Sequence, residues 1–152
     1  MSADPVARRV ASRDEFEAAL ALRYTLLRAP WGQPRGSERD EFDLYPPDEA
    51  RAVLVCVVDA GRVIGTGRVQ RVDAHTAQLR YLAVDESARR RGVARALIEA
   101  RVAIAREWGC ARVFCNARET SAPLFARLGF ALEGPGPTMF GSVAHVRMAR
   151  AL

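Results

Sequence analysis

The segment from Asp85 to Ala100, DESARRRGVARALIEA, combines three consecutive arginines with a glycine and small apolar residues. The apolar run YLAV just before it predicts a strand that ends at Val84, and helical periodicity follows from Arg91. The first turn of a helix offers unpaired N–H groups and a partial positive charge, and both favour phosphate. Gly92 would let a ligand approach the backbone closely, and Ala94 keeps the next turn small. This strand–loop–helix unit is therefore predicted to bind a pyrophosphate.

Two other phosphate-binding motifs are excluded. A Walker loop needs Gly-Lys-Ser/Thr, and the chain contains no lysine. The three-glycine dinucleotide fingerprint is also missing. The net charge of +5 raises the question of a nucleic-acid partner. All 23 basic residues are arginine, which together with abundant Ala and Val indicates biased codon usage rather than selection for a polyanion. The few aromatic residues lie mostly in apolar patterns, so no nucleic-acid partner is expected.

The remaining bulk properties indicate one soluble domain, residues 1–152, in a reducing compartment. Cys56, Cys110 and Cys115 are odd in number and lack metal-ligand spacing, so they are predicted to be buried free thiols. No signal-peptide pattern opens the chain, and no apolar run reaches the roughly 18 residues that a membrane span requires. The expectation is a cytoplasmic protein with no membrane contact and no metal.

The pattern of apolar residues predicts the order strand, helix, loop, three strands, helix, strand, helix, strand. The first helix begins with a capping box formed by Ser12 and Glu15. The glycines of GTG, Gly65 and Gly67, lie inside a predicted strand and favour a bend or bulge there. The other elements are predicted as strands 52–58, 63–72 and 77–84, a helix from Arg91 to Trp108, a strand 111–116, a helix 120–130, a hard turn at GPGP (134–137) and a last strand 142–149. The strand–helix–strand unit implies two parallel strands within a mixed, mostly antiparallel α/β sheet.

The segment LAVDESARRRGVARALIEA resembles the acetyl-CoA-binding motif of the Gcn5-related N-acetyltransferase (GNAT) superfamily, whose signature is Gln/Arg-x-x-Gly-x-Gly/Ala. Arg89, Gly92 and Ala94 occupy its three defined positions. Downstream, NARETSAPLFARLGF resembles the superfamily's second motif, a helix in which a Tyr precedes Leu-Gly-Phe. The resemblance extends from Arg51 to Met148 and includes the order of elements. It implies a GNAT-like sheet with helices on its flanks and acetyl-CoA as the cosubstrate.

The resemblance also implies where acetyl-CoA binds. The parallel strands would part near Val84 and Asn116 and open a slot for the thioester. The backbone of the β-strand before the loop would pair with the pantetheine arm, and N–H groups at the helix start would hold the pyrophosphate, with Arg89 and Arg90 near the phosphates. The expected binding residues are Leu82, Ala83, Val84, Arg89, Arg90, Arg91, Gly92, Val93, Ala94, Asn116 and Phe125.

The catalytic groups depart from the superfamily's pattern. Phe125 stands where members often have a Tyr, so it has no proton to give to the departing thiolate. Gln78 matches a position where some members carry a carboxylate base, and it could orient a water. The Val84 N–H is a candidate oxyanion donor. His145, in SVAHVRM, is either the general base or a structural histidine of the last strand.

The favoured function is an N-acetyltransferase in which a primary amine attacks the thioester of acetyl-CoA directly. The alternative is a protein that binds CoA with little or no catalysis, and a basic nucleic-acid-binding module ranks below both. The acceptor amine is not identified, and a homodimer is common in the resembling families. Four acidic residues precede the core, and they either attract a cationic amine or form a solvated face: Glu38, Asp40, Glu41 and Asp43.

Overall fold

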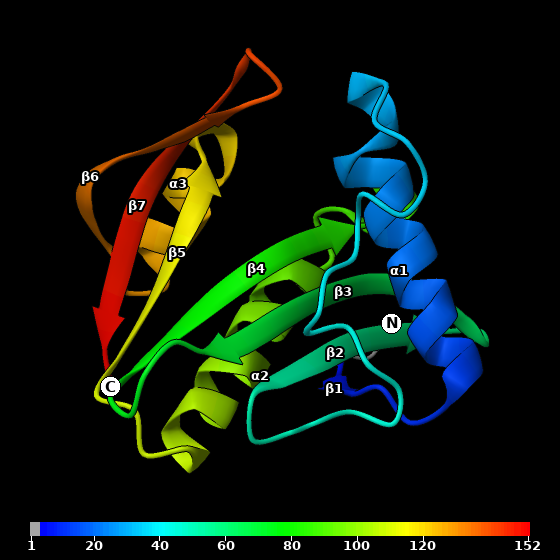
Figure 1. Cartoon of the computed structure of the whole chain (residues 1–152), viewed down its shortest axis with the longest axis horizontal. Coiled ribbons are helices and arrows are strands. Elements are labelled where there is room, and N and C mark those ends of the chain that lie inside the picture. Colours follow the sequence, from blue (N-terminus) through cyan, green and yellow to red (C-terminus); the bar gives the residue numbers. More distant parts are fainter. Residues whose placement is uncertain (1–3) are drawn as a thin grey trace.

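In residues 4–152, which the computed structural model describes, seven strands form one mixed sheet in the order β1-β2-β3-β4-β5-β7-β6 (Figure 1). The strands are β1 (Ala7–Arg9), β2 (Ala52–Asp59), β3 (Arg62–Arg71), β4 (Thr76–Val84), β5 (Arg112–Arg118), β6 (Ala131–Met139) and β7 (Val143–Ala151). The helices are α1 (Arg13–Leu27), α2 (Val93–Glu107) and α3 (Ala122–Arg127), with short 3-10 turns η1 (Ala29–Trp31), η2 (Glu86–Ala88) and η3 (Glu119–Ser121). None of the helices in this part of the chain is long and apolar enough to cross a membrane.

Helices α1 and α2 cover opposite faces of the sheet (Figure 1). The α2 face carries the main core, because apolar residues of β2, β3, β4 and β5 meet Leu97, Ile98 and Val102 of the helix there. Helix α1 starts at the predicted capping box: the Ser12 hydroxyl accepts the Glu15 N–H at 3.1 Å, and the Glu15 carboxylate accepts the Ala11 N–H at 2.9 Å. The predicted N-cap bond of Ser12 is confirmed, whereas Glu15 bonds the N–H of Ala11 rather than that of the N-cap residue, as a full capping box would require.

The only parallel pair among the described strands is β4 with β5, and it is short. The two strands pair from Thr76 opposite Arg112 to Leu79 opposite Cys115, and then they diverge (Figure 1). The predicted mixed sheet with a splayed parallel pair is confirmed. The divergence begins at Leu79, five residues before the Val84 position predicted for it.

A β-bulge interrupts the pairing of β3 with β4 where the divergence begins. The register shifts between Thr66 and Arg68 on β3, opposite Tyr81 of β4, which has a φ of +60°. A Cβ atom on Gly67 would lie 2.7 Å from the Arg101 Cζ of α2, so a larger residue here would displace the Arg101 guanidinium. The prediction of a bulge at this GTG segment is confirmed.

Two predicted boundaries are wrong. Helix α2 begins at Val93 rather than Arg91, because Gly92 has a φ of +81°, which a right-handed helix cannot contain. The predicted GPGP turn is part of β6, which the prediction missed. The prolines fit because β6 is the edge strand of the sheet and its register with β7 shifts at Leu132 and Pro135.

Candidate active site

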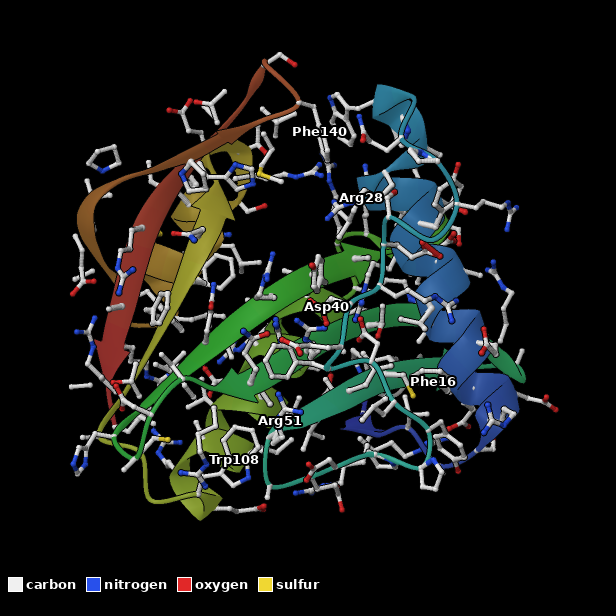
Figure 2. The ribbon with its side chains drawn as sticks, in the orientation of Figure 1. Phe16, Arg28, Asp40, Arg51, Trp108 and Phe140 are labelled. Carbon is white, nitrogen blue, oxygen red and sulfur yellow. The ribbon has the colours of Figure 1, made fainter. Side chains whose placement is uncertain are left out.

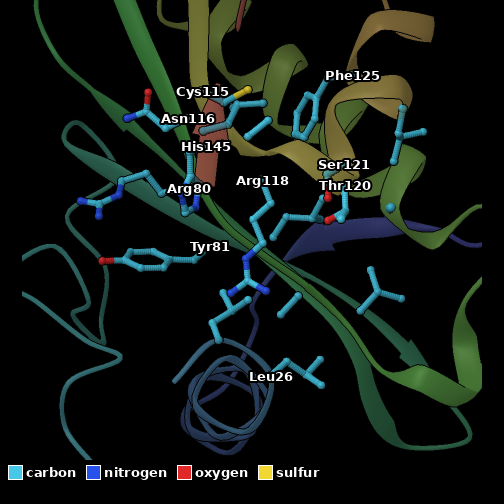
Figure 3. A pocket seen from close by; sticks show the side chains of 18 of the residues that line it. Leu26, Arg80, Tyr81, Cys115, Asn116, Arg118, Thr120, Ser121, Phe125 and His145 are labelled. Carbon is cyan, nitrogen blue, oxygen red and sulfur yellow. The ribbon is translucent and has the colours of Figure 1, made fainter. Parts of the chain in front are cut away.

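A cavity of about 610 Å³ lies where β4 and β5 separate (Figure 3). Its walls come from β4, from the junction of η2 with α2, from β5 and from α3. On the other face of the sheet it reaches the end of α1 and the turn between β6 and β7. The lining includes eight arginines and no aspartate or glutamate. The cavity is therefore strongly electropositive along its whole length.

The β4 wall presents free backbone groups to the gap. The Asp85 N–H donates to the Ile64 carbonyl of β3 at 2.8 Å, and backbone groups alternate between the two sides of a strand. The N–H and C=O groups of Val84 and Leu82 consequently face the gap, whereas those of Ala83 face Thr66 of β3. Ala83 lines the cavity, but its predicted backbone pairing with the pantetheine arm is excluded by this alternation.

The start of α2 forms the next wall. Gly92 is its N-cap and supplies no side-chain cap, so the N–H groups of the first turn stay available, beginning at Val93. Arg90 has a φ of +64° and Gly92 one of +81°, and such turns point successive N–H groups inward as an anion-binding nest. Arg89 and Arg90 line the cavity as predicted. Arg91 does not line it, and its guanidinium lies 3.3 Å from the Asp59 carboxylate.

The opposite wall consists of β5 and α3. Asn116 and Phe125 both line the cavity, as predicted, and Phe125 is buried with its ring edge-on to Phe130 at 5.2 Å. Cys115 also faces the cavity, but burial raises the pKa of its thiol to about 12. A protonated thiol is a poor nucleophile. Cys56, Cys110 and Cys115 are all buried free thiols, which confirms that prediction.

His145 and Gln78 line the cavity from the side of the sheet that α1 covers. The His145 Nδ1 lies 3.1 Å from the Pro137 carbonyl and 3.0 Å from the Val143 carbonyl. Because carbonyl oxygens only accept hydrogen bonds, Nδ1 carries the proton and Nε2 keeps the free lone pair in the neutral ring. Gln78 lies on β4 where that strand still pairs with β5, opposite Phe114.

Residues 16–130 match the model of the acetyltransferase (GNAT) family. The chain belongs to this GNAT family of acetyltransferases. A Bacillus subtilis (strain 168) protein that is named as an acetyltransferase is 23% identical over 143 residues, which are 94% of each chain. Escherichia coli ElaA shares the fold with a TM-score of 0.79 at 16% identity, over 96% of this chain and 99% of that chain. An aminoglycoside 6'-N-acetyltransferase solved with coenzyme A has a TM-score of 0.78 at 13% identity, over 96% of each chain.

Membership of the GNAT family makes this protein an acyltransferase that depends on acetyl-CoA. The predicted family and fold class are thereby confirmed. These two solved structures are only 16% and 13% identical to this chain, so they support the shared fold and carry no information on its acceptor. The acceptor has to be inferred from the residues themselves.

The acidic residues between α1 and β2 were predicted either to attract a cationic acceptor or to form a solvated face. Both predictions are wrong for three of the four residues, and only Glu41 is exposed. Asp40 pairs with Arg68 through two hydrogen bonds of 2.7 and 2.9 Å. Asp43 pairs with Arg23 at 2.8 Å, and the side chains of both are buried. Glu38 is buried and accepts the Gly36 N–H at 2.7 Å. Asp40 and Asp43 hold the loop against β3 and α1, and Glu38 is hydrogen-bonded to the backbone of the loop itself, so these three carboxylates already have partners.

The sequence analysis missed several residues at the acceptor end of the cavity. Arg28, Arg80 and Arg118 line it, and Trp31 stacks on Phe140 at 5.8 Å between ring centroids. Figure 2 shows Arg28 and Phe140 pointing toward each other across the opening. Only the strand alternation that places Arg80 on the same face as Gln78 could have put one of them in the site, because the others come from segments far apart in the sequence.

Proposed function

We propose that this GNAT acetyltransferase transfers the acetyl group of acetyl-CoA directly to a primary amine, with His145 as the general base. The observation that carries the proposal is the joining of three features in one cavity. These are the free backbone edge of β4, the uncapped start of α2 and the imidazole of His145. Each has a different part in the reaction.

The first two features would hold acetyl-CoA. Leu82 and Val84 offer their N–H and C=O groups to the amide-rich pantetheine arm, which would add to β4 as a short strand. The N–H groups from Val93 onward, with Arg89 and Arg90, would bind the pyrophosphate by charge-assisted hydrogen bonds. A β4 N–H at Val84 or Leu82 would then donate to the thioester oxygen, a contribution worth about 3 kcal/mol in comparable oxyanion holes.

His145 would remove the proton from the ammonium form of the acceptor, directly or through a water that Gln78 orients. Its Nδ1–H is fixed by two carbonyl groups, so Nε2 is the nitrogen left to accept a proton. The neutral amine attacks the thioester carbon, the C–S bond breaks, CoA leaves as the thiolate, and the second proton of the amine passes to water as the amide forms. Phe125 cannot protonate it, and a thiolate with a reference pKa of ~8.5 can leave without an acid.

The experiment is a thiol-release assay with acetyl-CoA and a panel of amines, followed by the His145→Gln variant. We expect kcat to fall by about 100-fold, within the range for loss of a general base, with KM for acetyl-CoA unchanged. His75→Gln is the matched control, because His75 is exposed in the turn between β3 and β4 and does not line the cavity. Equal activity of the two variants would remove His145 from the mechanism.

Tight CoA binding with no thiol release from any amine would instead favour a binding protein with little catalysis. The homodimer and the cytoplasmic location stay predictions.

A further inference from the structure

The acceptor end of the cavity holds three arginines without a carboxylate partner. Arg28, Arg80 and Arg118 are partly buried, and none of them takes part in an ion pair within residues 4–152. Figure 3 shows Arg118 extending into the cavity toward α1, with Arg80 nearby on β4. Burial and the charge of Arg28 lower the pKa of Arg118. Several guanidinium groups are thus gathered with no counter-charge, which costs free energy unless a ligand compensates it.

The phosphates of acetyl-CoA do not account for these arginines. Side chains alternate along a strand, so Arg80 lies on the opposite face of β4 from Leu79, which packs in the core under α2. Arg118 extends toward α1 (Figure 3), and Arg28 is the residue that ends α1 itself. The start of α2, where the pyrophosphate would bind, lies on the other face of the sheet (Figure 1). The three arginines therefore face the acceptor and not the cosubstrate.

Each of these arginines lies over an aromatic ring, and for Arg80 that ring is Tyr81. The Arg118 Cζ lies 4.5 Å from the centre of the Trp31 ring, and the Arg28 Cζ lies 5.2 Å from that of Phe140. Arg28 uses its Nε and Nη1 on the carbonyls of Ser37 and Leu27. Its Nη2 remains available, as do the side-chain donors of Arg118. A guanidinium is planar and presents its N–H donors as a fork, which suits a carboxylate or a phosphate.

The base lies next to this arginine pair. In the ladder between β5 and β7, Arg118 is directly opposite His145, so their side chains stand on the same face as neighbours. An acceptor whose anionic group contacts Arg118 would present its amine to His145. The contact between Trp31 and Phe140 joins the two sides of the opening and leaves less room for an extended polymer.

We propose that the acceptor is a small amine that carries a carboxylate or a phosphate group, which Arg118 and Arg28 bind while the amine reaches His145. This inference rests on the proposed acetyl transfer to an amine. It excludes polyamines, aminoglycosides and lysine-rich peptides as preferred acceptors, because these cations would meet three unpaired guanidinium groups and no acid.

The test compares matched acceptors by thiol release from acetyl-CoA. Each anionic amine is paired with its neutralised form: α-amino acids with their carboxamides, and O-phosphoethanolamine with ethanolamine, with spermidine as the cationic acceptor. We expect kcat/KM to be at least tenfold higher for the anionic member of at least one pair. The pair with the larger difference in kcat/KM shows whether the anionic group of the preferred acceptor is a carboxylate or a phosphate. Equal values throughout, or a preference for spermidine, would overturn the inference and leave acetyl transfer intact.

The variant Arg118→Gln should raise KM for the anionic acceptor tenfold or more, with KM for acetyl-CoA unchanged. Arg106→Gln is the matched control, since Arg106 is an exposed arginine of α2 outside the cavity. Arg118→Glu should reverse the preference toward the neutral or cationic acceptor, which a merely structural arginine would not do. If no amine yields CoA, the proposed function fails. The same pairs are then titrated into the CoA-bound protein, where equal binding within each pair overturns the inference as well.

Discussion

Arg101 of α2 joins the two strands at the β-bulge, and its replacement should weaken both the fold and the reaction. Its side chain is fully buried, and its Nη1 donates to the carbonyls of Arg68 on β3 and Arg80 on β4, at 3.1 and 3.2 Å. Its Nε donates to the Leu97 carbonyl at 3.0 Å. The guanidinium thus supplies the hydrogen bonds that the bulge at Gly67 removes from the ladder. We predict that Arg101→Met destabilises the protein and lowers kcat.

Two opposing effects set the magnitude of this change. Burial lowers the pKa of Arg101 from 12.5 to about 10, which corresponds to a cost of about 3 kcal/mol for keeping it charged in the fold. Both the folded and the unfolded chain keep the proton below pH 10, so this cost is present in full at neutral pH. Three hydrogen bonds from a charged donor contribute about 1.5–3 kcal/mol each. The hydrogen bonds outweigh the cost, and the net loss in Arg101→Met should be about 2–6 kcal/mol.

Urea unfolding at neutral pH measures this loss, with Arg106→Met as the control for an exposed arginine on the same helix. The folded variant should also show a lower kcat at saturating acetyl-CoA, because Arg101 holds the Arg80 carbonyl just before the β4 segment whose Leu82 and Val84 N–H groups face the gap. An unchanged free energy of unfolding would refute the reasoning, since the hydrogen bonds would then only offset the burial of the charge. A loss of stability without any fall in kcat would separate the bulge from catalysis.

Three further predictions concern α1, the opening and the start of α2. A hydrogen bond from Arg8 lowers the pKa of Glu15 from 4.5 to about 2, so its stabilisation is present above pH 4.5 and is lost as the pH falls toward 2. The difference in Tm between wild type and Glu15→Gln should therefore shrink over that window; a constant difference would contradict this. Phe140→Asn should raise KM for the acceptor without lowering Tm, because Asn tolerates the φ of +52° better than Phe. Gly92→Val should abolish CoA binding in calorimetry, since its φ of +81° and the nearby N–H groups do not accept a β-branched residue, and unchanged affinity would reject the anion nest.

The strand, loop and helix start at one end of the cavity could be predicted because they depend on local sequence. A strand, a short loop and a helix start lie within Leu82–Ala94, and backbone geometry determines what that unit can bind. The same holds for the capping box of α1 and for the bulge at Gly67. Each of these features is set by residues close together in the chain, so tertiary packing had little opportunity to change them.

The acceptor half could not be predicted because it is assembled from distant segments. Trp31 meets Phe140 across more than a hundred positions of sequence, and Asp43 meets Arg23 and Arg68 from three different elements. A run of acids between α1 and β2 predicts a solvated or cation-binding surface until the buried partners are known. Likewise the edge position of β6 permits prolines that argue against a strand when only the sequence is considered.

The same limit applies to the net charge. The composition indicated that the excess of arginine reflects codon usage rather than selection for a polyanionic partner. A total charge, however, does not show where the unpaired charges lie. Ten of the arginines form ion pairs with carboxylates, and none of these ten lines the cavity. Eight of the thirteen others do line it, and no carboxylate joins them there. The positive charge is thus concentrated at one site, where the phosphate-rich cosubstrate of the family would bind from one face. On the other face, the partly buried guanidiniums of Arg28, Arg80 and Arg118 require an anion of their own, which is why the acceptor is better sought among acidic amines than among polycations.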